Sequence, residues 1–166
     1  MNQDAKDRFS AGADLWADYG QRPLGRIRHE LTWENLRPHL PALIEGEAPP
    51  CVLEVGGGSG ELALRLAQHG YRVWLLDYAA EMLDQARHVA LSLSDDAQAR
   101  LTFCTMPAEE ASEAFAPGMF QVITCHTLLE YLEQPKATIA ELARLLSRDG
   151  LLSISIVNRH AESFRT

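Results

Sequence analysis

The chain has 166 residues, of which 46% are hydrophobic, and a formal net charge of -8. This length and composition predict one globular domain with a sizeable apolar core. The negative charge argues against a broad electrostatic grip on nucleic acid, because neutralising phosphates requires a basic face.

Helical patterns occupy the first part of the chain. Residues 5–19 have apolar anchors at helical spacing, and so do residues 24–40. The second pattern repeats at Leu24, Ile27, Leu31, Leu36 and Leu40. Residues 22–28, RPLGRIR, form either a local basic patch or the solvated start of this helix. The proline-containing segment 41–50 then breaks the pattern, so we predict an N-terminal helical annex over residues 1–48.

The N-terminal residues MNQDAKDRFS are polar and contain no apolar stretch of the kind found in a secretion signal. Nowhere does the chain approach the ~20 consecutive apolar residues that a membrane span needs. We therefore predict a soluble, cytoplasmic protein without a membrane partner.

From Cys51 onward, short apolar runs alternate with helical patterns. The expected strands are residues 51–56, 72–77, 101–106, 120–126 and 151–157. The expected helices are residues 61–70, 79–93, 108–115 and 136–150, with Gly70 ending the first and Gly150 the last. Strands that are apolar throughout and alternate with helices predict an α/β fold, a mostly parallel sheet with helices on both faces. This domain occupies residues 49–166.

The cysteines of the chain, Cys51, Cys104 and Cys125, all lie inside these apolar strand patterns and form no CxxC pair. We interpret them as buried, reduced thiols. This interpretation predicts neither a disulfide nor a metal site.

A glycine-rich run, GGGSG over residues 56–60, follows the first strand, where ligands bind in parallel sheets. Glycines let the backbone approach a ligand, and the helix start that follows offers free N–H groups. No Gly-Lys-Ser/Thr follows, which excludes a phosphate loop, and Glu61 stands where the dinucleotide fingerprint has Gly or Ala. A plain tight turn is the structural alternative.

Two candidate residues follow the second strand. Asp77 lies 21 positions after Gly56, close to the ~20 expected of a carboxylate that accepts from ribose hydroxyls. Its alternative role is an N-cap for the next helix, and the two roles can coexist. Tyr78 either covers an adenine ring or packs at the helix start.

Candidates also follow the third and fourth strands. Ala108 and Glu109 could meet the edge of an adenine, although an acid in an acidic loop is also typical of solvated surface. His126 ends the fourth strand, beside the glycine run if the first and fourth strands are neighbours. It is either a ligand contact or a structural hydrogen-bonding residue.

Several of these stretches occur in an order that resembles the motifs of Rossmann-like, S-adenosylmethionine-dependent methyltransferases. They are LEVGGGSGELAL, LLDYAAEML, MPAEEA, CHTLLEYL and LARLLSRDGLLSIS, within about residues 51–157. The resemblance implies a Rossmann-like methyltransferase fold, S-adenosyl-L-methionine as cofactor and S-adenosyl-L-homocysteine as product. It implies that Glu54 helps to position the methionine amino group and that Asp77 takes the ribose hydroxyls. The remaining implied contacts are Gly56, Gly57 and Gly58 near the methionine and ribose, and Ala108 with Glu109 beside the adenine.

A narrower resemblance includes the N-terminal annex. YGQRPLGRIRHELTWENL, together with the glycine run and CHTLLEYL, is similar to bacterial tRNA 5-carboxymethoxyuridine methyltransferases. Those enzymes esterify the carboxylate of a modified wobble uridine. The resemblance implies that Arg28, or Arg26 if the alignment slips, meets the cofactor carboxylate, and that His126 lines the cofactor site.

Methyltransferases of this family normally have two further strands after the fifth, whereas this chain ends at VNRHAESFRT. We therefore expect the C-terminal strands to be missing. An uncovered edge strand favours aggregation, so we expect either a missing C-terminal segment or a second copy in a homodimer to cover it.

The resulting prediction is an S-adenosylmethionine-dependent methyltransferase that acts on tRNA or on a small molecule. Such an enzyme must align the acceptor and exclude water. No catalytic residue is certain. His126 is the candidate base for a hydroxyl acceptor, while a carboxylate needs none. The alternatives are a small-molecule O- or N-methyltransferase, a nicotinamide oxidoreductase, which Glu61 disfavours, and a cofactor-binding module without turnover.

Overall fold

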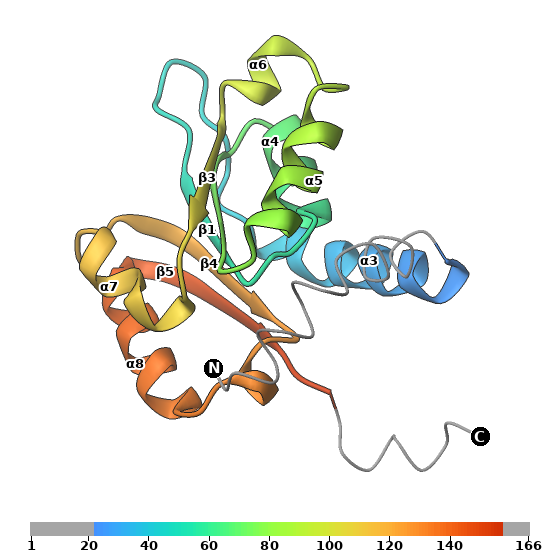
Figure 1. Ribbon diagram of the computed structural model, residues 1–166. Helices are drawn as coiled ribbons and strands as arrows, with labels where there is room; N and C mark the ends of the chain where they lie inside the picture. The colour runs from blue at the N-terminus through green and yellow to red at the C-terminus, as the bar shows by residue number, and fades with distance from the viewer. Residues whose placement is uncertain (1–21, 158–166) are drawn as a thin grey trace.

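A computed structural model describes residues 22–157, so the helix expected over residues 5–19 lies outside them. The first elements are α3 (Pro23–Leu36), η1 (Arg37–His39), β1 (Cys51–Val55), α4 (Glu61–Gln68), β2 (Arg72–Asp77), α5 (Ala80–Ala90) and α6 (Asp95–Gln98). They are followed by β3 (Leu101–Thr105), η2 (Ala108–Glu110), α7 (Ala111–Ala114), β4 (Phe120–His126), η3 (Leu129–Tyr131), α8 (Pro135–Leu145) and β5 (Leu146–Ser155). Strands and helices alternate as predicted (Figure 1).

The five strands of residues 22–157 belong to one sheet in the order β3-β2-β1-β4-β5, and every neighbouring pair is parallel. β1 is the middle strand, with Leu53 in register with Trp74 of β2 and Ile123 of β4. The strand order reverses at β1, because the chain goes first to β2 on one side and later to β4 on the other. Ligands bind at such a switch point in open α/β sheets.

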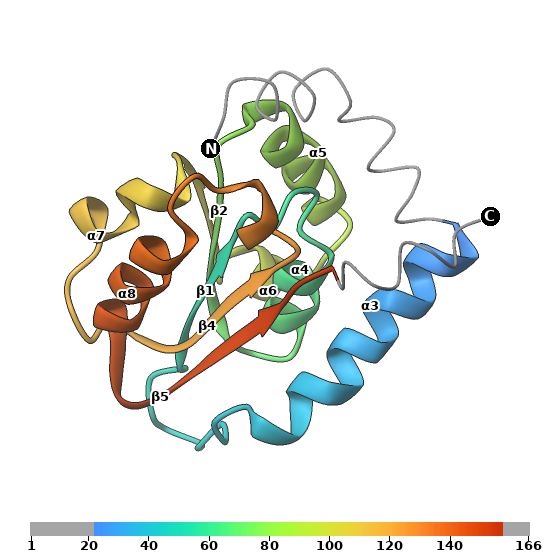
Figure 2. The ribbon, with the colours of Figure 1, turned by 90° about the horizontal axis from the view of Figure 1, so that it is seen from below.

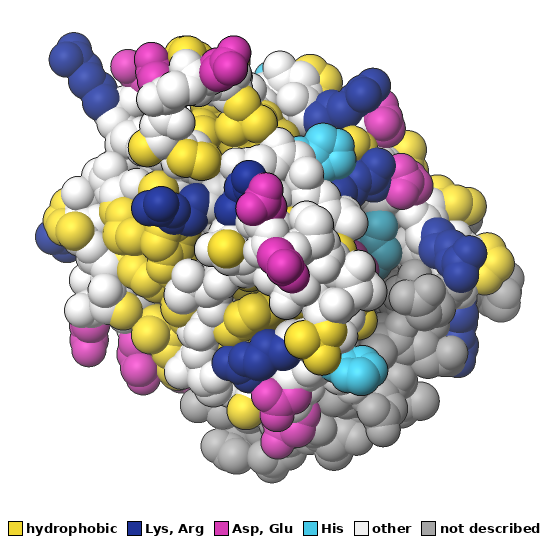
Figure 3. Space-filling model, turned by 90° about the horizontal axis from the view of Figure 1, so that it is seen from above, with side chains coloured by type: hydrophobic (Ala, Val, Ile, Leu, Met, Phe, Trp, Pro, Cys, Tyr) yellow, Lys and Arg dark blue, Asp and Glu magenta, His cyan; other side chains and the backbone are white. Residues whose placement is uncertain are grey.

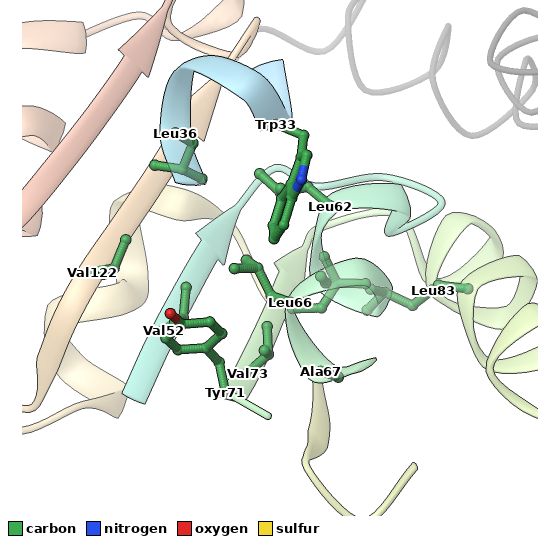
Figure 4. Packing of buried hydrophobic residues seen from close by; sticks show 13 residues of the cluster. Trp33, Leu36, Val52, Leu62, Leu66, Ala67, Tyr71, Val73, Leu83 and Val122 are labelled. Carbon is green, nitrogen blue, oxygen red and sulfur yellow. The ribbon is translucent and has the colours of Figure 1, made fainter. Parts of the chain in front are cut away.

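Helices cover both faces of the sheet (Figure 2), as predicted. One face packs against α3, α4 and α5. Figure 4 shows Leu66 of α4 beside Val52 of β1 and Val73 of β2. The other face packs against α7 and α8, where Leu53 meets Leu142. Neighbouring residues of β1 thus enter opposite cores, which explains why the strands are apolar throughout.

The N-terminal helix α3 follows the predicted apolar spacing only towards its end. The leucines and isoleucine of its first turns are largely exposed, namely Leu24, Ile27 and Leu31 at 62%, 55% and 58%. Leu36 is buried as the spacing indicated, together with Trp33, which lies outside that pattern. Arg65 of α4 lies over the Trp33 ring, 4.6 Å from its centroid, and donates to Glu30 at 2.8 Å. The helix is therefore anchored to α4 through its last turns.

The last helix ends earlier than predicted. α8 stops at Leu145 and β5 follows at once, so Gly150 lies within a strand and ends no helix. The pairing of β5 with β4 shifts register beside Phe120, and a Cβ at Gly150 would lie 3.2 Å from the Phe120 carbonyl oxygen. The glycine permits this close backbone approach. Gly70, with φ +99° after α4, does end its helix as predicted.

The prediction of buried cysteines holds fully only for Cys125, since Cys51 and Cys104 are half-buried. Cys104 lies on β3, which is an edge strand, and Cys51 is the first residue of β1. All three are free thiols, and burial raises the pKa of each, that of Cys125 to about 12.

The surface mixes charges of both signs. Figure 3 shows Lys and Arg side chains beside Asp and Glu side chains, with apolar groups between them. On this face, charges of one sign do not form a continuous field. Over residues 22–157, no helix is both long and apolar enough to span a membrane.

Candidate active site

The glycine loop curls over the carboxyl end of the sheet. The Gly56 N–H donates to the Leu76 carbonyl oxygen at 2.7 Å, which ties the loop to β2. Gly57 leaves no room for a side chain, because a Cβ there would lie 2.4 Å from Leu75 Cδ1 and 2.6 Å from the Glu54 carboxyl carbon. This loop therefore needs glycine for a close approach, beyond what a plain turn requires.

A cavity opens beside this loop, between α3 and the carboxyl ends of β1, β2 and β4. The predicted site residues that line it are Arg28, Glu54, Gly56, Gly57, Gly58, Asp77, Tyr78 and His126. Arg26 is not among the lining residues. Neither are Ala108 and Glu109 of η2, whose contact with an adenine stays a prediction.

Asp77 is 7% exposed, and both its carboxylate oxygens are hydrogen-bonded. Oδ2 accepts from the Gly58 N–H and Oδ1 from the Ala79 N–H, each at 2.9 Å. Burial raises the pKa of Asp77, and these backbone donors oppose that rise. Asp77 is not the predicted N-cap, because the N-cap residue of α5 is Ala79, whose side chain makes no capping hydrogen bond. Its carboxylate instead joins the glycine loop to the residue before α5, a structural role that coexists with its place in the cavity.

Glu54 is the second buried carboxyl group of the site, also 7% exposed. Its Oε2 atom has no hydrogen-bond partner among residues 22–157. Burial, and then the charges of Glu61 and Asp77, raises the pKa of Glu54 to about 8. The group is therefore mostly protonated at neutral pH, and a cation placed against it would supply a partner and favour its charged form.

Nitrogen-bearing side chains reach the same cavity from α3 and β4. Arg28 and His29 come from α3, and His126 comes from the end of β4. His126 Nε2 lies 2.9 Å from Ser153 Oγ. Burial, and then the charge of Arg28, lowers the pKa of His126 to about 4, so its ring is neutral at pH 7. The cavity thus combines carboxyl groups with basic groups, which suits a ligand that carries both charges.

Some lining residues were missed by the sequence analysis. They are His29, Thr32, Ser59, Leu62, Met82, Thr127, Leu128, Tyr131 and Ser155. Glu61 also lines the cavity, but the sequence analysis used it only as evidence against a dinucleotide site. Helical spacing could have indicated Thr32, four positions after Arg28 on the same face. No sequence signal indicates Thr127, which has φ +54°, the one positive value of a non-glycine residue between positions 22 and 157.

The family model of the methyltransferase domain matches residues 52–150. This match covers the glycine loop, Asp77 and His126, and the parallel sheet places these residues at one end. The chain belongs to the class I S-adenosylmethionine-dependent methyltransferases, whose cofactor is S-adenosylmethionine.

Two curated relatives differ in their acceptors. The chain is 29% identical to the tRNA 5-carboxymethoxyuridine methyltransferase of Escherichia coli K12 over 138 residues, which is 82% of this chain and 50% of that protein. It is 32% identical to the ubiquinone biosynthesis O-methyltransferase of Xanthomonas campestris pv. campestris over 167 residues, which is 99% of this chain and 65% of that protein. The chain thus spans between half and two thirds of the length of these relatives.

A solved structure shows the same fold with the cofactor product bound. It is a methyltransferase from Geobacter sulfurreducens in complex with S-adenosylhomocysteine, with a TM-score of 0.59 and 26% identity. The match covers 76% of this chain and 47% of that one.

Proposed function

We propose that the chain binds S-adenosylmethionine in this cavity and transfers a methyl group to an oxygen atom of an acceptor. The observation that carries the proposal is the buried Glu54 carboxyl group with its unpartnered Oε2. This carboxyl group packs directly against the glycine loop, because a Cβ at Gly57 would lie 2.6 Å from the Glu54 carboxyl carbon. An amino-acid ammonium group supplies both a positive charge and N–H donors for this atom, whereas a sugar hydroxyl supplies a neutral donor and a nicotinamide ring nitrogen supplies no N–H.

The residues around the cavity divide the work of holding this cofactor. Glu54 would accept from the methionine ammonium, Arg28 would bind its carboxylate and Asp77 would accept from the ribose hydroxyls. Tyr78 would lie beside the adenine. When bound, the cofactor supplies a sulfonium that activates its own methyl group. The task of the chain is then to orient the acceptor and keep water out, rather than to provide a nucleophile.

The acceptor that the site favours is a carboxylate. A general base works best when its pKa lies near the working pH, and the pKa of His126, about 4, is too low for that. A carboxylate arrives ionised and needs no base, whereas a hydroxyl must lose a proton. The match to the tRNA 5-carboxymethoxyuridine methyltransferase supports a modified tRNA uridine as its source.

A small-molecule hydroxyl is the second candidate acceptor. The match to the ubiquinone biosynthesis O-methyltransferase extends over 99% of this chain, and the net charge of -8 does not favour binding to tRNA. For this acceptor, His126 would have to act as a base in a complex whose surroundings raise its pKa.

Calorimetric titration with S-adenosylhomocysteine and with NADH tests cofactor binding. We expect the first to bind and the second not to bind, and binding of NADH alone would overturn the proposal.

A second experiment tests the acceptor. The chain is incubated with cofactor carrying a radioactive methyl group and with tRNA from cells that lack the modification. Mild alkali then distinguishes the products, because it releases methanol from a methyl ester and leaves a methyl ether intact. A parallel incubation replaces the tRNA with a small phenol. Alkali-stable label on the phenol, with no label on tRNA, would favour the second candidate.

A further inference from the structure

His29 is another polar group of the cavity with an unsatisfied atom. The residue lies on α3 and is half-buried, and its Nε2 atom is shielded from solvent without a hydrogen-bond partner among residues 22–157. Leaving a buried polar atom unpaired costs about 1–3 kcal/mol, so such an atom needs an explanation. Glu54 lines the same cavity and also has an unpaired side-chain atom, Oε2, so two lining residues of the described part have unmet hydrogen-bonding capacity, one an acid and one a base.

We propose that His29 is a further binding residue of the cofactor site, donating from Nε2 to the carboxylate of the amino-acid tail. This inference rests on the proposed function. The ammonium and carboxylate of an amino acid are attached to one carbon, so its tail carries a partner for a lining acid and a partner for a lining base. A carboxylate has two oxygens and about four acceptor sites, so His29 can bind it together with Arg28. His29 then makes the site specific for an intact tail.

The charges around His29 are compatible with this role. Burial lowers the pKa of His29, Glu61 and Glu30 raise it, and Arg28 lowers it. Both oxygens of Glu61 accept from Ser59 Oγ, at 3.0 and 3.1 Å, which holds that carboxylate on its own loop. A ligand carboxylate would add a negative charge beside the ring and favour the imidazolium, which donates from both nitrogens.

The test compares two ligands on the full chain by calorimetry. One is S-adenosylhomocysteine, and the other is S-adenosyl-3-thiopropylamine, which keeps the amine and lacks the carboxylate. We expect His29→Ala to weaken binding of the first about tenfold, the loss of a hydrogen bond to a charged group, and to change binding of the second by less than about twofold. His29→Gln retains an N–H donor at similar reach and should keep most of the affinity. His88→Ala, on the exposed side of α5, is the matched control and should change neither.

Two results would overturn the inference. One is that His29→Ala binds S-adenosylhomocysteine as tightly as the unaltered chain does, and the other is that His29→Ala loses the same factor of affinity for both ligands. The second result would indicate a purely structural role for His29, which thermal melts of the variants would also reveal. Nitrogen NMR of the histidine side chains gives an independent readout, because Nε2 of His29 should be protonated when S-adenosylhomocysteine is added. If the unaltered chain binds no S-adenosylhomocysteine, the proposed function fails, and this inference fails with it.

Discussion

Within residues 22–157, the β1–β2 side of the cavity is closely packed, whereas the α3–β5 side leads into an open apolar groove. On the β1–β2 side, Gly57 packs against Leu75 and Glu54, and Asp77 is hydrogen-bonded through both oxygens. On the α3–β5 side lies a groove beside an edge strand. The exposed apolar residues of this groove are Leu24, Ile27, Leu31, Ile154, Ile156 and Val157, between 38% and 66% exposed. The β1–β2 side is closed by these contacts, and the α3–β5 side is open.

The contacts on the β1–β2 side come from a short stretch of sequence, whereas Arg28, His29 and His126 reach the cavity from elsewhere in the chain. The loop, the carboxyl groups and the start of α5 all fall between residues 54 and 80. Substitutions on the closed side should therefore affect cofactor affinity strongly, and substitutions in the groove should affect it little. Four variants test that separation.

Gly57→Ala should have the largest effect. The new Cβ would overlap Leu75 and the Glu54 carboxyl group, which costs about 1–3 kcal/mol of folding free energy. We expect S-adenosylhomocysteine affinity to fall about 100-fold or more, measured by calorimetry. Gly46→Ala is the matched control, since its φ is +85° but its Cβ meets nothing within 4 Å. It should cost only about 1 kcal/mol and leave affinity unchanged. Equal effects of the two variants would contradict the close approach at Gly57.

Glu54→Gln should weaken S-adenosylhomocysteine binding about 10- to 100-fold, because the amide removes the charge that meets the ammonium. It should also change how stability depends on pH. The pKa of Glu54 in the folded chain, about 8, lies above its ordinary 4.5. The unfolded chain therefore loses this proton first as pH rises, so the stability that the protonated group contributes is lost between pH 4.5 and 8.

The thermal melts of Glu54→Gln check this sign. The variant should melt above the unaltered chain by about 5 °C or more at pH 8, and the difference should shrink towards pH 5. A constant difference across this range would show that Glu54 is not the titrating group.

His126→Ala should have a smaller effect. We expect S-adenosylhomocysteine affinity to fall about three- to tenfold, because the cavity loses a wall and Ser153 loses its partner at 2.9 Å. Turnover at saturating cofactor should change little if the acceptor is a carboxylate. Normal affinity with abolished turnover would instead assign His126 as a base.

Ile27→Ser, in the groove, should have the smallest effect. The side chain is 55% exposed, so stability should change by no more than about 0.5 kcal/mol, and affinity by less than about twofold. Leu66→Ala, at a fully buried position of α4, should cost about 2–5 kcal/mol. Thermal melts compare the two. A large loss from Ile27→Ser would show that the groove is covered in solution.

Much of the fold could be predicted from sequence, because its signals are local. Apolar runs located the strands, and the glycine run with Asp77 located one wall of the cavity. The end of α8 could not be predicted, because Leu146 joins β5 through pairing with Phe120 of β4, far away in sequence. The buried face of α3 depends in the same way on a distant residue, Arg65.

Spacing and residue type indicated the part of the candidate site that follows strands, whereas on α3 the family resemblance indicated only Arg28. His29 stands next to Arg28 but no sequence signal singles it out, and its unpaired nitrogen becomes visible only when α3 lies beside the glycine loop. Ala108 and Glu109 show the opposite case, since they follow β3 as expected but do not line the cavity.

The paired hydrogen bonds of Asp77 have a consequence for the entropy of ligand binding. Its carboxylate already restrains the Gly58 and Ala79 amides, and it still has lone pairs to accept from a hydroxyl. A ribose that reaches it therefore adds a bond and displaces none. Because the chain's own hydrogen bonds already restrain the loop backbone, we expect little conformational freedom to be lost on association. The amide signals of these two residues should consequently shift together, without a change in their exchange protection.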